Sequence, residues 1–439
     1  MSILGKLFHS EKGEINSVRF GRASEEFKTP EQVEMWNHSM EAFESQKYFE
    51  SFEYLLNYLS IPDLKNIRYD RAADNIRFEL EQGSKVLVGD LGLEWFVIKA
   101  KIARGEGYSI GVMRKLLESG LDLQYCRYSI DKENYLCLVF DGFISEASPY
   151  RLFFGLREMA IKADKLDDML LDEFEHLTPI HNHHIISYPD SVIKVRTDFY
   201  YKTLLSALDS GAIGSLNADR HPGAWTYIFL SAIYKIDYLV CPEGRAMELI
   251  ENAHLRYFNP DGSDVYQKSE GLRKAIHDLS ELPVDRLKKE IYKVNHTFGV
   301  KSTVPFQTIA EFITAELSAI EWYRANKHDK ICFAICTYIT GYILFSFSAE
   351  EPVLELLHFY YRCDEPEYFR NLGFDSLELS DDPSFKMAES KLKSAVKKIL
   401  SKYDRKYPGL NSLTDLNCDS KLDFYISLLL MVRDLNIKS

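Results

Sequence analysis

Alternating apolar and polar residues are concentrated in the first part of the chain, and this pattern restricts the fold more than any other feature. Between residues 76 and 104, "IRFEL" and "EWFVIKAKIAR" place apolar side chains at every second position, and "KVLVGD" continues the run between them, which is typical of strands with one buried face. From about residue 197 onward, the apolar residues recur at helical spacing instead. We therefore expect an α+β N-terminal domain followed by an all-α C-terminal domain.

The elements before residue 121 can be placed individually. A helix is expected from Trp36 to Leu59, where apolar residues recur at helical spacing before a proline. The alternating stretches, with a turn at Gly83, then predict an antiparallel meander of three strands. A short helix should follow from Ile110 to Ser119, since Ser109 suits the N-cap and a glycine ends the run.

A β-hairpin and a long helix complete the predicted domain. "YCRYSI" and "NYLCLVF" flank the polar turn Asp131–Glu133, which indicates a hairpin. In "PYRLFFGLREMAIKADKLDDMLLDEF" the apolar residues form one helical stripe, and charged residues such as Asp167 and Asp168 are expected on the exposed side. Residues 30–178 therefore read as helix, three-strand meander, helix, β-hairpin and long helix, after an N-terminal tail at residues 1–29.

This order of elements resembles the small αβββαββα domains of type III secretion chaperones and their YbjN-like relatives. The resemblance covers about residues 30 to 178. It rests on the element order and on "LLESGLDLQYCRYSIDKENYLCLVF" and "LREMAIKADKLDDMLLDEF", where the second stretch resembles the closing helix of those domains. The resemblance implies a non-enzymatic protein-binding domain that often pairs through its sheet and long helices. The chain departs from this pattern in carrying the residues after 178 as well.

The rest of the chain is predicted to be helical. Residues 179–195 should form a linker, and residues 196–439 an all-α domain of seven to nine helices, one of which starts at Asp382-Pro383. The longest uncharged run, from Ile331 to Phe347, is shorter than the roughly 20 residues that cross a bilayer and contains hydroxyl side chains. We expect a buried core helix there and no integral membrane segment.

Composition narrows the class of protein. A formal net charge of -13 disfavours a nucleic-acid binder, because neutralising phosphates requires the opposite charge balance. The seven cysteines show no paired spacing, which indicates reduced thiols and a cytoplasmic protein. With 46% hydrophobic residues, each domain can bury a large core.

The stretch "EHLTPIHNHH" holds the most conspicuous group of potential metal ligands. If it is extended, His181 and His183 point the same way and His184 points the other way, so the weak metal candidates are His181 and His183. Pro179 and Pro189 bracket the stretch, which favours an exposed interdomain connection and no bound metal. Further ligands, were a metal bound, could come from His176 and Asp190.

A second histidine and cysteine group lies in the helical half. His328, Cys332 and Cys336 recur at every fourth position and should share one helical face. Successive turns are about 5.4 Å apart, so the outer two cannot share one ion at bonds of roughly 2 Å. Cysteine on an apolar helix is more often a small core residue. No cofactor is expected.

The motifs G-x-S-x-G, H-E-x-x-H, G-x-x-x-x-G-K-[ST] and C-x-x-C do not occur, and two main functions remain beside a structural or scaffold role. The first is a non-enzymatic protein-binding or chaperone-like protein that acts through its α+β domain on a protein partner or client, forms a homodimer through that domain, and uses the helical domain as a second interaction surface. The alternative is an enzyme of unknown class with a site in the interdomain cleft. Convergent polar groups with shifted pKa values would favour the enzyme, and an exposed apolar surface or sheet edge would favour the binder.

Overall fold

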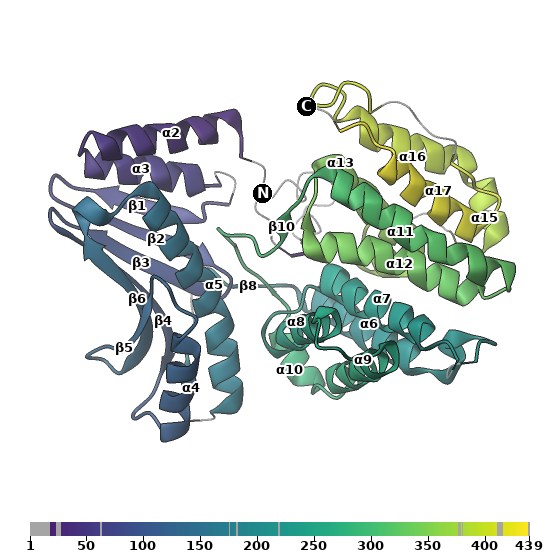
Figure 1. Cartoon of the computed structure of the whole chain (residues 1–439), viewed down its shortest axis with the longest axis horizontal. Helices are drawn as coiled ribbons and strands as arrows, with labels where there is room; N and C mark the ends of the chain where they lie inside the picture. The colour runs from purple at the N-terminus through teal and green to yellow at the C-terminus, as the bar shows by residue number, and fades with distance from the viewer. Residues whose placement is uncertain are drawn as a thin grey trace. The chain divides into compact units, whose positions relative to one another are not determined.

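The structure, a computed structural model, describes residues 18–22, 28–61, 64–174, 176–180, 183–217, 220–375, 379, 381–410 and 416–437, without the Asp168 side chain. By its contacts the chain forms two compact units, which are drawn in Figure 1. Unit 1 comprises the described residues of Ala23–Ser187 and Tyr292–Val300. Unit 2 comprises those of Ile3–Arg22, Tyr188–Ile291 and Lys301–Ser439.

Unit 1 combines helices with an antiparallel sheet, which confirms a mixed fold with its sheet in the N-terminal half of the chain. The strand order in the sheet is β1-β2-β3-β4-β6-β5, with β7 pairing to β4. Its elements are α2 (Pro30–Glu44), α3 (Tyr48–Leu59), β1 (Ile67–Arg71), β2 (Ile76–Gln82), β3 (Lys85–Leu91), β4 (Trp95–Arg104), α4 (Ile110–Gly120), β5 (Arg127–Ile130), β6 (Tyr135–Phe143), η2 (Ile144–Glu146), α5 (Pro149–Glu173), β7 (Thr178–Pro179), β8 (Ile186–Ser187) and β9 (Tyr292–Lys293).

The first strand of the sheet was not predicted, so the expected meander of three strands is wrong by one strand. β1 pairs antiparallel with β2, in a register that sets Ile67 opposite Leu80. Ile67 is half-buried, and the other residues of β1 are exposed. Because both faces of this edge strand are open to solvent beyond Ile67, its sequence lacks the alternation that marked the inner strands.

The helix expected from Trp36 to Leu59 is interrupted and forms two helices, α2 and α3. The break falls at Gln46, whose φ of +59° lies in the left-handed region and cannot continue a helix. Ser39 and Ser51 are both buried, and each hydroxyl donates a 2.7 Å hydrogen bond to the other residue's carbonyl oxygen. These reciprocal bonds hold the two helices against each other, which apolar spacing alone did not reveal.

The long helix α5 covers one face of the sheet, as the apolar stripe predicted, and in Figure 1 it runs beside β3 and β4. Its Leu156, Met159 and Ala163 are fully buried against that face. The helix α4 also matches its predicted bounds within one residue, and the Ser109 side chain accepts a hydrogen bond from the Val112 amide as an N-cap.

Unit 2 is built almost entirely of helices. The described residues contain twelve α-helices after Ser187, more than the seven to nine expected. Its elements are α6 (Asp190–Leu208), η3 (Ser210–Ile213), α7 (Pro222–Val240), α8 (Gly244–Phe258), α9 (Val265–Ser280), α10 (Val284–Lys289), β10 (Ser302–Thr303), α11 (Phe306–Ala325), α12 (Asp329–Ser346), β11 (Phe347–Ser348), α13 (Glu351–Asp364), α14 (Pro366–Asn371), α15 (Asp382–Met387), α16 (Glu389–Ser401) and α17 (Lys421–Arg433).

One excess helix arises where a single helix was expected after Asp382-Pro383. The structure has two helices there, α15 and α16, separated at Ala388. Asp381, one residue earlier than expected, is the N-cap, and its side chain accepts from the Ser384 amide at 2.9 Å. Short strand pairs such as β10 with β11 also interrupt the all-α pattern.

The uncharged run after residue 330 forms α12. Within the part of the chain that the structure describes, this is the one helix whose length and composition would allow it to cross a membrane, and 67% of that window is buried inside the fold. Cys332, Cys336 and Ile339 are among its fully buried residues. The expectation of a buried core helix is therefore met.

Candidate functional site

The histidine-rich stretch does not gather its side chains around one point. His181 lies outside the described residues. His183 is exposed in a turn, with its Nε2 atom 3.4 Å from the guanidinium of Arg68. His184 was expected to be exposed but is buried, and its Nε2 atom lies 2.8 Å from the carbonyl oxygen of Gly83. The Arg68 cation beside His183 and the hydrogen-bond contact of His184 with a backbone carbonyl both disfavour a metal ion shared by the two histidines.

No group of three or more histidine, cysteine or acidic side chains has metal-binding geometry within the described ranges. In the second group that the sequence suggested, His328 is the N-cap residue of α12 rather than part of its face. Cys332 and Cys336 are fully buried, and burial raises the pKa of the Cys332 thiol to about 11. Protonated core thiols of this kind are poor ligands and poor nucleophiles.

A buried polar cluster surrounds the turn between β2 and β3. The Ser84 amide donates to Asp164 Oδ1 at 2.7 Å, and the Ser84 hydroxyl donates to Asp167 Oδ2 at 3.2 Å. The Lys85 ammonium forms an ion pair with Asp167 and also donates to the Ile102 carbonyl at 3.2 Å. Asp164 and Asp167 stand one turn apart on α5, so one helix face supplies both carboxylates.

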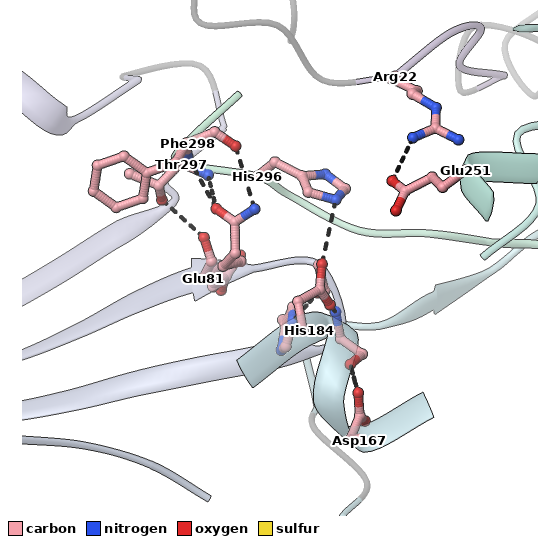
Figure 2. Close-up of polar contacts among 12 residues, drawn as sticks. Arg22, Glu81, Asp167, His184, Glu251, His296, Thr297 and Phe298 are labelled. Carbon is pink, nitrogen blue, oxygen red and sulfur yellow. Dashed lines mark hydrogen bonds and ion pairs between the residues drawn. The ribbon is translucent and has the colours of Figure 1, made fainter. Parts of the chain in front are cut away.

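The Asp164 carboxyl is the most perturbed acid in this cluster. Burial, and then the neighbouring Asp167 carboxylate, raise the pKa of Asp164 to about 7, although the Ser84 amide and Lys85 oppose the shift. The His296 ring stands 3.9 Å from Asp164 Oδ2, and Figure 2 shows His184, His296 and Asp167 around this point. An acid that titrates near neutral pH is what general acid-base chemistry requires.

The cluster is nevertheless enclosed. Ser84, Lys85, Asp164 and Asp167 are all less than a tenth exposed, and each contacts at least one of the others. Such a network stabilises one arrangement of the chain without offering a substrate a way in. Sequence reasoning placed Asp167 on the exposed side of its helix. That placement was wrong, because the buried Lys85 on β3 draws the carboxylate inward.

The helix α4 presents the contrasting feature, a continuous apolar face in solvent. Its residues Ile110, Met113, Leu117 and Leu121 follow one another at helical spacing, the last of them at the C-cap. Their exposed fractions are 89%, 41%, 74% and 88%. The opposite face holds the buried Val112 and Leu116. We call the four exposed residues the α4 stripe.

Charged side chains of α4 are paired. Arg114 Nε lies 2.8 Å from Glu118 Oε1, one turn along the same helix. Lys115 Nζ lies 2.8 Å from Glu173 Oε1 at the end of α5. The edge strand β5 adjoins the helix, where the Ser119 hydroxyl donates to the Tyr128 hydroxyl at 3.0 Å. Of these, only the Arg114–Glu118 pair borders the stripe, because Lys115 and Ser119 lie on the buried side of α4.

The comparisons with known proteins give no family for this chain. No protein-family model, no curated protein and no solved structure matches it.

Proposed function

We propose that this protein is a non-enzymatic, chaperone-like protein-binding protein that acts through the α+β region at residues 30–178. The observation that carries the proposal is the α4 stripe. Four large apolar side chains on one helix face are costly to leave in water, at about 25 cal/mol for each Å² of apolar surface. Such a contiguous exposed face is typical of a surface that another protein covers.

A second copy of the chain is the occupant that this surface fits. In an antiparallel pair of α4 helices about a two-fold axis, Ile110 lies opposite Leu121 of the second copy, and Met113 lies opposite Leu117. The same axis brings Arg114 of one copy beside Glu118 of the other, so charges as well as apolar residues are self-complementary.

Several features support the rest of this assignment. The element order of unit 1 fits the αβββαββα pattern with an added first helix and strand, in keeping with the secretion-chaperone and YbjN-like resemblance. Units 1 and 2 correspond to the α+β and helical domains in this proposal, with the helical domain as a second interaction surface. All seven cysteines are free, as a reducing cytoplasm requires.

Light scattering coupled to size-exclusion chromatography tests the proposal on the full chain over a range of concentrations. We expect a concentration-dependent dimer that Leu117→Glu abolishes, because a charge replaces the centre of the apolar contact. Leu93→Glu is the matched control, since Leu93 is 68% exposed in unit 1 but lies outside the stripe. A monomer at every concentration, or a dimer that survives Leu117→Glu, would overturn the proposal.

A further inference from the structure

A short segment from far along the sequence is bound to unit 1, first as a strand and then through a bend at Thr297 and Phe298. Residues 292–298, here called the inserted segment, follow α10 by sequence, yet they belong to unit 1. Their first two residues pair as β9 with β8, in a register that sets Tyr292 opposite Ser187. His296 then forms a β-bridge with Gln82, and the Gly83 amide donates to the Asn295 carbonyl at 2.9 Å.

The side chain of Gln82 binds the backbone of this segment at three points. Its oxygen accepts hydrogen bonds from the Thr297 amide at 3.1 Å and the Phe298 amide at 2.9 Å. Its nitrogen donates to the Phe298 carbonyl at 3.2 Å. Figure 2 shows Thr297 and Phe298 of the segment above Glu81 on β2. Recognition of the backbone alone would accept many sequences in this position.

Side-chain contacts add sequence preference. The Asn295 amide donates to Glu81 Oε2 at 2.8 Å and to the Leu64 carbonyl at 3.2 Å. The Thr297 hydroxyl donates to the Glu81 carbonyl at 2.8 Å and accepts from Asn66 at 2.9 Å. These contacts favour an amide side chain at the position of Asn295 and a hydroxyl side chain at the position of Thr297.

An aromatic anchor ends the segment. Phe298 is 1% exposed and lies in the apolar core of unit 1, with its ring centroid 5.7 Å from that of Phe153 in an edge-to-face arrangement. An aromatic side chain of this size makes a large contribution to binding when it is wholly buried. The contacts together select the pattern Asn-x-Thr-Phe in a chain that bends at its last two residues.

The end of β2 is built to receive such a segment. Along β2 the alternation of buried and exposed residues stops after Leu80, and Glu81 and Gln82 are both buried despite being polar. A buried amide needs hydrogen-bond partners, because leaving it without them costs about 1–3 kcal/mol. The inserted segment supplies the partners of Gln82 from a position more than 200 residues away.

We propose that this end of unit 1 is a peptide-recognition site for short segments of the pattern Asn-x-Thr-Phe that bend at the threonine and phenylalanine, and that residues 295–298 are its internal ligand. An external peptide of the same pattern, from a partner protein, takes the place of the internal ligand when the latter is released. The site shares no residue with the α4 stripe, so it is a second surface beyond the proposed function and is tested separately from it.

The test uses the full chain and a fluorescein-labelled peptide corresponding to residues 291–301. In the Phe298→Ala variant the internal ligand lacks its anchor, so we expect the labelled peptide to bind at least about tenfold more tightly than it binds the unmodified chain, as measured by fluorescence anisotropy. A peptide whose own phenylalanine is replaced by alanine should bind neither protein. Adding Gln82→Ala to the variant should abolish binding, whereas adding Leu117→Glu should leave it unchanged.

Two results would overturn the inference. One is equal binding of the peptide to the variant and to the unmodified chain. The other is no binding to a variant whose circular dichroism and cooperative unfolding show that it is folded. Should Phe298→Ala fail to fold, Thr297→Val replaces it, because it keeps the side-chain volume and removes only the hydroxyl bonds to Glu81 and Asn66. The same two results then decide the outcome.

Discussion

A side chain on Gly83 would overlap the carboxylate of Asp164. Gly83 has a φ of +54°, and a Cβ atom built on it would collide with both oxygens of that carboxylate. Gly83→Ala therefore strains the backbone at a left-handed φ and displaces the buried Asp164 carboxylate. We expect it to lower the free energy of unfolding by about 2–4 kcal/mol. Urea unfolding of the full chain measures the loss, and hydrogen exchange in β2 and β3 assigns it to unit 1.

Gly107 provides the control for this substitution. It lies in the connection between β4 and α4, where no atom of the described residues stands within 4 Å of an added Cβ atom and the φ angle is not left-handed. Gly107→Ala should change stability by less than about 0.5 kcal/mol. Equal effects of the two substitutions would contradict the assignment of Gly83 as a position that Asp164 requires to be glycine.

Asp164 should also make unit 1 sensitive to pH. Its pKa is raised from 3.8 to about 7 by burial and by Asp167, so the folded state holds this proton more tightly than the unfolded chain does. The stabilisation is complete below about pH 4 and is lost as the pH rises through about 7. The carboxyl thus makes the free energy of unfolding decline across this interval.

The variant Asp164→Asn isolates that contribution. An amide oxygen can still accept from the Ser84 amide, but the group no longer titrates. We expect the melting temperature of the variant to fall less than that of the unmodified chain between about pH 4 and pH 7, and to exceed it at about pH 8. Parallel pH profiles for the two proteins would show that Asp164 does not titrate in this range.

The sequence predicted the elements that depend on local pattern. The stripe along α5 and the capped helix α4 both follow from spacing and from residues such as Ser109. Helix breaks were missed at Gln46 and Ala388, because neither position carries a proline or a glycine to mark it. In α2 and α3 the decisive contacts are side-chain bonds between helices, which no local window contains.

The candidate sites depend on contacts between distant residues, and the sequence could not reveal them. In the sequence Asp167 has the pattern of a surface acid, and only the structure places Lys85, 82 positions earlier, beside it. The stretch around Thr297 carried no predicted role, since its contacts with Gln82 span more than 200 residues. The alternation of buried and exposed residues in β2 stops at Glu81, directly after Leu80, but this burial is visible only in the structure.

Lys301 is a buried cation in unit 2, and its removal should stabilise the protein. The side chain is 7% exposed, and burial, assisted by the nearby Arg22 guanidinium and opposed by Asp237, lowers its pKa from 10.5 to about 8. A lowered lysine pKa means that the charged ammonium destabilises the folded state at neutral pH. Lys301→Met should therefore raise the melting temperature at about pH 7.

This gain should shrink as the pH rises from about 8 to 10.5, because the unmodified lysine then loses its proton on folding and the penalty disappears. Lys330→Met is the control, since Lys330 is exposed and its ammonium donates to the Gly211 carbonyl at 2.8 Å. It should produce no gain at either pH. A destabilised Lys301→Met protein at neutral pH would show that the charge is needed where it lies.

Two neighbouring leucines on α4 should respond differently to substitution by alanine. Leu116 is 5% exposed and faces the core of unit 1, whereas Leu117 in the α4 stripe is 74% exposed. Leu116→Ala should lower the free energy of unfolding by about 2–4 kcal/mol through lost burial and a cavity. In a dilute, monomeric sample, Leu117→Ala should change it by less than about 0.5 kcal/mol, because the side chain is already in water. At concentrations where copies associate, Leu117→Ala should weaken self-association while Leu116→Ala, below its melting temperature, should not. An equal loss of unfolding free energy for Leu117→Ala and Leu116→Ala in the dilute monomer would show that the stripe is part of the core. It could then not serve as a docking surface.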